Sequence, residues 1–185
     1  IDLNAIKEYQ DKMNTSLSPE ELLKKRHLIT KNGQLTIAGL LLFGKDPGGF
    51  FPAYRVRFVR YDGIKAETGS RLNIIKDQFF EGPIPTLVDD VSKMILSQLR
   101  DLQILDLNTG QFQTIPEYPR LAWFEGMINA ITHRDYSYDG GHIRITMYDN
   151  RLEIHSPGGL PGPITIKNMH EQRYSRNPHL ARVLF

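Results

Sequence analysis

Hydrophobic side chains recur at helical spacing in two long stretches of the chain. Between residues 83 and 103 they stand three or four positions apart, which predicts a long core helix that joins two parts of the protein. Its apolar positions are Leu87, Val91, Met94, Ile95, Leu99 and Leu102. A second amphipathic helix is predicted over residues 123–137. Its apolar stripe consists of Leu121, Phe124, Met127, Ile128 and Ile131.

Shorter helices are predicted from local signals. They cover residues 1–13, 19–27, 36–43, 164–169 and 178–185. In the first of them, Leu3, Ile6 and Tyr9 are expected to face inward. The second starts with Ser18 as its N-cap and a proline at the next position, where the missing N–H is not needed. The third is expected to be capped by Thr36.

Alternating apolar and polar residues predict strands. The strand-like stretches are residues 53–60, 142–148 and 151–155. In the first, Tyr54, Val56 and Phe58 point to one face of the sheet. Arg55 and Arg57 point to the other face. The last two stretches should form a hairpin, because a two-residue Asp-Asn turn joins them.

The remaining segments are less regular. Residues 61–82 show no clear period, and residues 104–119 are interpreted as a connector with at least one strand-like piece. The shift from a long apolar helix to this Pro- and Gly-bearing connector predicts a boundary between two parts. Because helices and strands are mixed along the chain, the predicted fold class is α/β.

A polar stripe runs along the predicted helix at residues 123–137. Glu125, Asn129 and His133 are spaced by four residues, so they lie within about 80° of arc on one side of the helix. A carboxylate, an amide and an imidazole in a row at the border of the core are typical of the wet edge of a ligand pocket. The alternative is a helix border that is simply hydrated.

A glycine-rich loop at residues 156–163 follows the predicted hairpin. It contains three glycines and three prolines. The hairpin should return this loop towards the polar stripe, and glycines let backbone amides approach a ligand closely. We therefore expect one cavity lined by Glu125, Asn129, His133 and the backbone of residues 156–159.

This order of elements resembles the GHKL (Bergerat-type) ATPase fold that gyrase, chaperone and histidine-kinase ATPase domains share. Glu125 and Asn129 match the Glu-x-x-x-Asn helix of that fold. The resemblance implies that Glu125 is a general base and that Asn129 holds Mg on the phosphates of ATP. The family then has Asp-x-Gly-x-Gly, whose Asp reads the adenine. Here the corresponding segment is Ser156-Pro-Gly158-Gly159, and serine cannot supply that carboxylate.

A closer resemblance is to a bacterial subgroup of helicase-related proteins and predicted transcriptional regulators. Its members share a Glu-x-x-x-Asn-Ala-x-x-His-Arg-Asp-Tyr-Ser stretch, a Ser/Asn-Pro-Gly-Gly-Leu-Pro loop and the Ser175-Arg-Asn-Pro178 segment. Residues 35–45 and 52–62 resemble the second half of the AlbA-type (Schlafen-like) DNA-binding domain that precedes the ATPase-like module in that subgroup. The sequence contains no helicase motor motifs.

The resemblance implies two incomplete parts. Residues 1–103 would be a partial AlbA-like α/β part, and residues 104–185 an incomplete GHKL-like α/β sandwich. The implied nucleotide-binding residues are Glu125, Asn129, His133, Ser156, Gly158 and Gly159, with Arg134 and Asp135 ordering the loop. One hypothesis is a transcriptional regulator with a module that binds ATP and Mg, and ATP turnover is left open. The other is a non-catalytic scaffold for dimerisation or DNA binding.

The implied partners are DNA, a nucleotide and a second copy of the chain in a homo-oligomer. Arg55 and Arg57, on one face of the strand at residues 53–60, could hold DNA phosphates. Alternatively, they lie on a solvated face and have carboxylate partners within the protein. The formal net charge of +2 is by itself too small to indicate a nucleic-acid binder.

Composition excludes several other classes. The absence of cysteine excludes disulfides and thiolate chemistry. The chain has no apolar run near 18 residues and no signal peptide, so we expect a cytoplasmic protein without a membrane span. It starts without methionine and ends in mid-pattern, which we interpret as a fragment.

Three motif-like segments do not carry the chemistry that their spacing suggests. Residues 39–45 have the spacing of a phosphate-binding loop, but Asp46 stands where magnesium binding needs Ser or Thr. His133-Arg-Asp135 matches the start of a kinase catalytic loop, but the Asn required five residues after the Asp is Gly140. The six histidines have no metal-ligand spacing, so zinc is not predicted.

Overall fold

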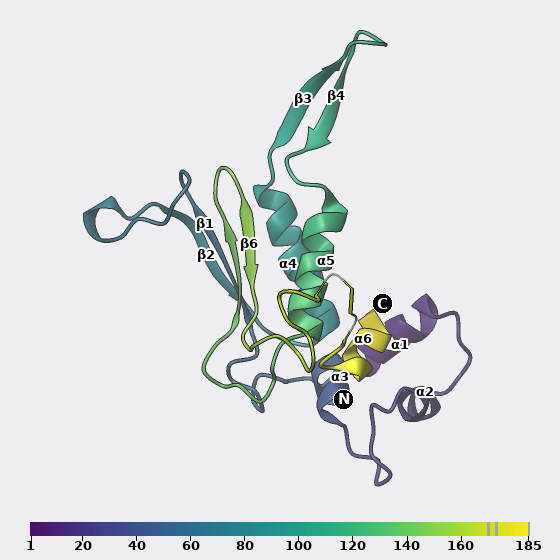
Figure 1. Cartoon of the computed structure of the whole chain (residues 1–185). Helices are drawn as coiled ribbons and strands as arrows, with labels where there is room; N and C mark the ends of the chain where they lie inside the picture. The colour runs from purple at the N-terminus through teal and green to yellow at the C-terminus, as the bar shows by residue number, and fades with distance from the viewer. Residues whose placement is uncertain (170, 173, 185) are drawn as a thin grey trace.

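The computed structural model describes residues 1–169, 171–172 and 174–184. Helices and strands alternate along the chain, which confirms the predicted α/β class (Figure 1). The helices are α1 (Leu3–Lys12), α2 (Pro19–Lys25), α3 (Ile37–Phe43), α4 (Ile84–Gln98), α5 (Arg120–Thr132) and α6 (Pro178–Leu184), with a 3-10 turn η1 (Gly69–Arg71). The strands are β1 (Val56–Tyr61), β2 (Ile74–Phe80), β3 (Asp101–Asp106), β4 (Gln111–Pro116), β5 (Ile143–Met147) and β6 (Leu152–His155).

Four strands form the main sheet in the order β2-β1-β5-β6. Strand β1 pairs antiparallel with β2 and parallel with β5, and β5 pairs antiparallel with β6. The sheet thus joins β1, from before the predicted boundary at residues 103/104, to β5, from after it. Whether the two stretches fold as separable units stays a prediction.

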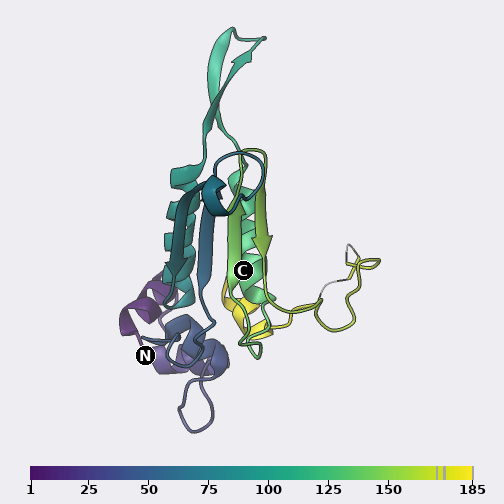
Figure 2. The same ribbon diagram turned by 90° about the vertical axis from the view of Figure 1, so that its left-hand side faces the viewer.

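Helices α4 and α5 pack on one face of this sheet, and Figure 2 looks onto the opposite face, with the helices behind the strands. The inward sheet residues Val56, Phe58, Ile143 and Ile145 share a buried cluster with residues from both helices. The helix residues include Leu87, Val91, Ile95, Met127 and Ile131, as their spacing predicts. Each such side chain contributes roughly 1.5–3 kcal/mol on burial, so this layer contact is the main source of stability.

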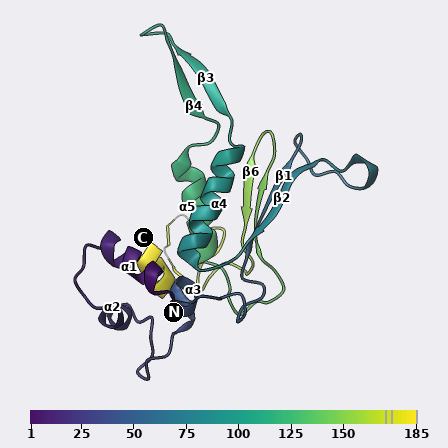
Figure 3. The ribbon, with the colours of Figure 1, turned by 180° about the vertical axis from the view of Figure 1, so that it is seen from behind.

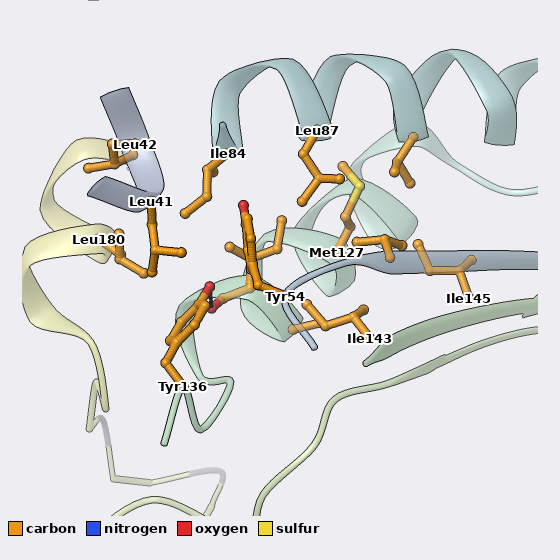
Figure 4. Packing of buried hydrophobic residues seen from close by; sticks show 14 of the residues in the cluster. Leu41, Leu42, Tyr54, Ile84, Leu87, Met127, Tyr136, Ile143, Ile145 and Leu180 are labelled. Atoms are coloured by element: carbon orange, nitrogen blue, oxygen red, sulfur yellow. Dashed lines mark hydrogen bonds between the residues drawn. The ribbon is translucent and has the colours of Figure 1, made fainter. Parts of the chain in front are cut away.

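The other end of the core is built from short helices. In Figures 1 and 3, α1, α3 and α6 gather beside the lower end of α4 and α5. Figure 4 shows Leu41 and Leu42 of α3 close to Ile84 and to Leu180 of α6. The capping box at Ser18, the Thr36 cap and the buried Ile6 follow the sequence prediction.

Strands β3 and β4 form a separate two-stranded hairpin, which projects away from the rest of the chain (Figure 1). The sequence predicted a connector with at least one strand-like piece over residues 104–119. Strand β4 confirms that piece, whereas the pairing of β3 with β4 into a hairpin was not predicted. The predicted boundary lies inside this hairpin.

Several local predictions were wrong. The long helix ends at Gln98, so Leu102 lies in β3. Residues 74–80 form the edge strand β2, whose pattern does not alternate cleanly. Residues 164–169 form turns, because Asn168 bonds the backbone of Pro163 and Thr165 and so competes with helical hydrogen bonds.

Two apolar residues that were expected to face inward are exposed. Leu3 is 66% exposed and Leu121 is 75% exposed. Each lies in the first turn of its helix. Periodicity places a residue on a side of a helix, but it does not show where along the axis the packing partner ends.

Candidate functional site

The polar stripe of α5 lies beside the edge strand β6. A Cβ added at Gly126 would stand 3.0 Å from Ile154 Cδ1, so this side of the helix packs directly against β6. Ser156 Oγ donates a hydrogen bond of 2.7 Å to the carbonyl of Ala130, which fixes the start of the glycine-rich loop to the helix. Asn129 and His133, half-buried, border this contact.

Glu125 lies further from the loop than the other two members of the stripe. It is exposed, and the eight residues between it and His133 correspond to about 12 Å along the helix axis. The cavity expected between the stripe and residues 156–159 would therefore have to extend about 12 Å along the helix axis, from His133 to Glu125. Glu125 stays a predicted site residue, and the structure places it at the outer end.

The glycine-rich loop touches the turn that follows α5. The backbone N–H of Asp135 donates to Pro157 O at 3.1 Å. Gly158 has φ +112, and a Cβ there would stand 2.8 Å from Asp135 Cβ and would also meet Arg176 Nη1. The position favours glycine because a side chain would require a rare backbone conformation and displace both neighbours.

Arg176 joins the same cluster from a segment that the sequence analysis did not place in the site. Its Nη2 donates to Gly159 O at 2.7 Å, and its Nη1 lies 3.6 Å from an oxygen of Asp135. The Ser175-Arg-Asn-Pro178 motif was the signal that could have identified it, since the motif was recognised but given no role. Predicted residues Asp135, Gly158 and Gly159 are thus brought together by Arg176.

Arg134 is a buried structural residue, with 1% of its surface exposed. Its Nη1 donates to the carbonyl of Asp135, and its Nη2 donates to those of Ala53, Tyr138 and Gly141, at distances between 2.8 and 3.3 Å. These bonds fasten the turn at residues 135–141 to the start of β1. The guanidinium faces backbone carbonyls, so it orders the turn and does not point to a ligand.

The end of α5 is capped by a second side chain. Asn177 Nδ2 donates to Thr132 O at 2.9 Å and to Arg134 O at 2.8 Å. Carbonyls at a helix C-terminus have no partner within the helix, so this amide satisfies two of them. Arg176 and Asn177 together hold the segment before α6 against α5 and the glycine-rich loop.

His133 has an open hydrogen-bonding position. Its Nδ1 is buried and has no hydrogen-bond partner among the described residues. Burial, and secondarily the positive charge of Arg176, lower the pKa of His133 below its usual value. The ring is therefore neutral at pH 7 and can accept or donate a hydrogen bond at the border of the stripe.

Asp135 and Arg176 also line a cleft of about 680 Å³. It separates α3 from the turn at residues 135–137 and from α6. Its walls include Ile37, Leu41, Phe51, Tyr136, Pro178 and Leu180. None of the stripe residues Glu125, Asn129 and His133 lines this cleft, so it is distinct from the predicted cavity.

The outer face of the sheet holds the two predicted DNA-contacting arginines. Arg57 donates two hydrogen bonds of 2.8 and 2.6 Å to the carboxylate of Asp77. This hydrogen bonding lowers the pKa of Asp77 and raises that of Arg57. Arg55 lies 3.7 Å from Glu81 and 4.2 Å from the centre of the Phe79 ring. Each arginine has a carboxylate partner within the chain, and DNA contact stays a prediction.

None of the helices in the described part of the chain is both long and apolar enough to cross a membrane. The same residues contain no group of three or more His, Asp or Glu side chains that could hold a metal ion.

Comparison with known proteins gives a match to a family and matches to solved structures. Residues 140–185 match a family described as "Putative ATP-dependent DNA helicase recG C-terminal". The matched stretch includes the glycine-rich loop and Arg176 but not the polar stripe of α5. No curated protein matches the chain.

One of the matching solved structures is the crystal structure of the DIP2311 protein from Corynebacterium diphtheriae, with a TM-score of 0.78 and 24% identity. The superposition covers 98% of this chain but 35% of that chain, so this chain spans about a third of its length. At this identity the match shows a shared fold. Together, the comparisons show that residues 140–185 are similar to this helicase-related family and that the mixed α/β chain shares its fold with DIP2311.

Proposed function

We propose that this chain is part of a DNA-binding transcriptional regulator and carries a nucleotide-binding module of the GHKL type. The observation that carries the proposal is the tie between Ser156 and Ala130, which sets the glycine-rich loop beside Asn129 and His133. The family match over residues 140–185 supports it, because that family is described as ATP-dependent. The division into residues 1–103 for DNA and 104–185 for nucleotide is part of the proposal.

The residues at this site fit a magnesium nucleotide. The unpartnered Nδ1 of His133 needs a hydrogen-bond partner, and Gly158 and Gly159 leave backbone where side chains would block an approach. Asn129 would hold Mg together with phosphate oxygens, which suits an ion that is commonly bound through substrate phosphates. When bound, the magnesium nucleotide supplies an activated phosphoanhydride.

Glu125 is proposed as the base of this site. Its exposed carboxylate can take a proton from a water molecule, but it lies at the outer end of the stripe. Ser156 cannot read adenine as an aspartate would, because it has no carboxylate. The module should therefore bind nucleotides with little preference for the base.

The test is a titration of the full-length protein with ATP and magnesium, followed calorimetrically. Asn129→Ala should weaken the magnesium-dependent part of binding, because it removes a metal-facing oxygen. The matched control is Asn108→Ala, which makes the same change in the β3–β4 turn and should leave binding unchanged. Glu125→Gln should preserve binding and remove any hydrolysis, because it keeps the shape but not the base.

Base selectivity gives an independent readout. ATP and GTP should compete within about tenfold, or roughly 1.4 kcal/mol. A strong preference for ATP would mean that another group reads the base. Failure of the wild-type protein to bind either nucleotide, with correct folding, would contradict the nucleotide-binding proposal.

The Ser156 hydrogen bond also favours a second candidate function, a scaffold without ATP turnover. A hydroxyl committed to the helix backbone serves the fold, and the same bond would persist in a domain that has lost its ligand. In this case the protein would bind DNA equally well with and without nucleotide. Independently of which function holds, limited proteolysis should cut first between residues 103 and 116 if the chain has two parts; a single resistant core with no cut between those residues would contradict the division.

A further inference from the structure

The β3–β4 hairpin, residues 101–116, is called the arm below. Its base is fixed to the body by charged groups. Arg100 and Glu117, directly outside the two strands, form an ion pair, and Glu117 N donates to Arg100 O at 2.9 Å. Arg100 Nη2 also donates to Asp149 O at 2.8 Å, and Asp149 pairs with the buried Arg60 at 2.7 Å. The arm therefore leaves the body at a defined place.

The arm itself exposes apolar side chains on both faces. These are Leu102, Ile104, Leu105, Leu107, Phe112 and Ile115, with exposed fractions from 38 to 86%. The pairing register puts Leu102 and Ile115 on one face, and Leu105 and Phe112 on the other. Figures 1 and 3 show the arm standing clear of the sheet and the helices. A two-stranded hairpin of this kind is at best marginally stable in water, so a partner must cover it.

The edges of the arm lack the usual protection against strand pairing. Exposed edge strands are commonly blunted by lysine, by proline within the strand or by a bulge. Residues 101–116 contain no Lys or Arg, their register is unbroken, and the one proline is at the end of β4. Their only charges, Asp101 and Asp106, stand at the two ends of β3. The edge of β4 is uncharged throughout.

We propose that the arms of two copies of this chain pair with each other through their β4 edges. An antiparallel β4–β4 contact brings no like charges together, whereas a β3–β3 contact would bring aspartates close to one another. Pairing would give a four-stranded sheet whose faces bring the apolar side chains of both copies side by side. A second copy is present whenever the chain is made, so it can cover an arm that is not stable alone.

The size of the arm fits a reversible dimer. The six side chains expose on the order of 600 Å² per copy, and pairing through the β4 edges buries only part of it, less than the roughly 800 Å² per partner of a standard stable interface. Backbone hydrogen bonds between the β4 strands add to this area. The dimer should therefore form at micromolar concentrations and dissociate on dilution.

The first experiment measures the mass of the full-length protein by light scattering and sedimentation over a concentration series. The wild type should be dimeric at high concentration. Leu105→Glu with Phe112→Glu, a cross-strand pair, should give a monomer with unchanged circular dichroism of the body. The matched control is Leu3→Glu with Leu96→Glu, which adds the same charge at exposed apolar positions on α1 and α4 and should remain dimeric.

A second pair of variants tests which edge is used. Gln113→Lys places a charge on β4 near the dyad and should weaken the dimer by about tenfold or more, whereas Gln103→Lys on β3 should change it less than about threefold. Hydrogen exchange adds a readout that does not depend on mutation: the amides of residues 101–116 should be protected at high concentration and exchange faster on dilution.

Several outcomes would overturn the proposal. These are a wild type that stays monomeric at all concentrations, a dimer that survives the arm charges, and a stronger effect of Gln103→Lys than of Gln113→Lys. Arm amides that stay protected in a monomer would also overturn it, because another segment of the same protein would then cover the arm.

Discussion

The end of α5 and the outer face of the sheet both present arginines that the sequence marked as site residues, but they hold them differently. Arg134 is buried and donates to backbone carbonyls from three parts of the chain. Arg57 and Arg55 lie on the outer face of the sheet beside Asp77 and Glu81. The Arg134 guanidinium donates to backbone carbonyls, in the place that a backbone N–H takes in secondary structure. The guanidinium groups of Arg55 and Arg57 form ion pairs at the surface.

The difference determines what a ligand could take over. A phosphate can compete with Asp77 for Arg57, because a partly exposed ion pair contributes only about 0–1 kcal/mol. No ligand can replace the carbonyls around Arg134 without unfolding the turn at residues 135–141. An arginine in a motif is thus informative about ligand binding only when a ligand can displace the groups to which it donates.

The largest effect is expected for Arg134→Met, which should lower the free energy of unfolding by about 3–5 kcal/mol. Hydrogen bonds from a charged donor contribute about 1.5–3 kcal/mol each, and their loss leaves buried carbonyls unpaired. Arg57→Met, the matched change on the sheet face, should cost less than about 1 kcal/mol. Urea unfolding of both variants measures the contrast, and equal losses would remove the distinction between the two regions.

The second prediction tests whether DNA phosphates can displace the carboxylate partners of Arg55 and Arg57 on the outer face of the sheet. Changing both Arg55 and Arg57 to Glu should abolish DNA binding and remove its salt dependence. Asp77→Asn should strengthen DNA binding at low salt, because it releases Arg57. Binding isotherms at several salt concentrations give both quantities. Unchanged binding by the folded double variant would leave this face structural.

The sequence predicted the elements of the core better than their surroundings. The helices α4 and α5 and the strands β1, β5 and β6 have strong periods, because each packs one apolar side on a continuous layer. Strand β2 was missed because it lies at an edge. The arm was predicted only as a connector with at least one strand-like piece, because neither of its faces is buried in the chain. A local hydrophobic period arises from burial of one side of an element. It therefore does not predict elements whose burial is partial or depends on another molecule.

For the candidate site, the sequence indicated the helix and the loop but not what connects them. The stripe of α5 and the glycines at 158 and 159 were visible as patterns. The roles of Ser156, Arg176 and Asn177 depend on contacts between segments 17 to 45 residues apart, and no local pattern shows such contacts. Arg134 was assigned to the site because its buried carbonyl partners cannot be recognised from the sequence.

The third prediction tests how tightly the α5 region is packed. Gly158→Ala should lower the free energy of unfolding by about 1–3 kcal/mol, because its backbone conformation disfavours a side chain and the new Cβ would meet Asp135. Gly159→Ala is the matched control: nothing lies within 4 Å of its Cβ position, so the change should stay within about 0.5 kcal/mol. Thermal unfolding of the two variants would decide; similar losses would mean that the loop is not held by Asp135.

The smallest expected effects are on two histidines, one in each region. Burial is the first cause that lowers the pKa of both His133 and His142; Arg176 adds to it for His133, and Arg55, Arg57 and Arg144 add to it for His142. A folded pKa below the unfolded value of about 6.5 means that the unfolded chain binds more protons. Stability should therefore be constant above this pH and fall as the pH drops through it, and His133→Gln should reduce the fall.

DNA separates the two histidines further. Phosphates bound at Arg55 and Arg57 would offset the positive field at His142, so the pKa of His142 should rise when DNA is added, whereas that of His133 should not change. NMR titration of the imidazole signals with and without DNA measures both. A rise in the pKa of His133 alone would place the phosphates beside Arg176 at the glycine-rich loop. That result would contradict the prediction that DNA phosphates bind to Arg55 and Arg57 on the outer face of the sheet.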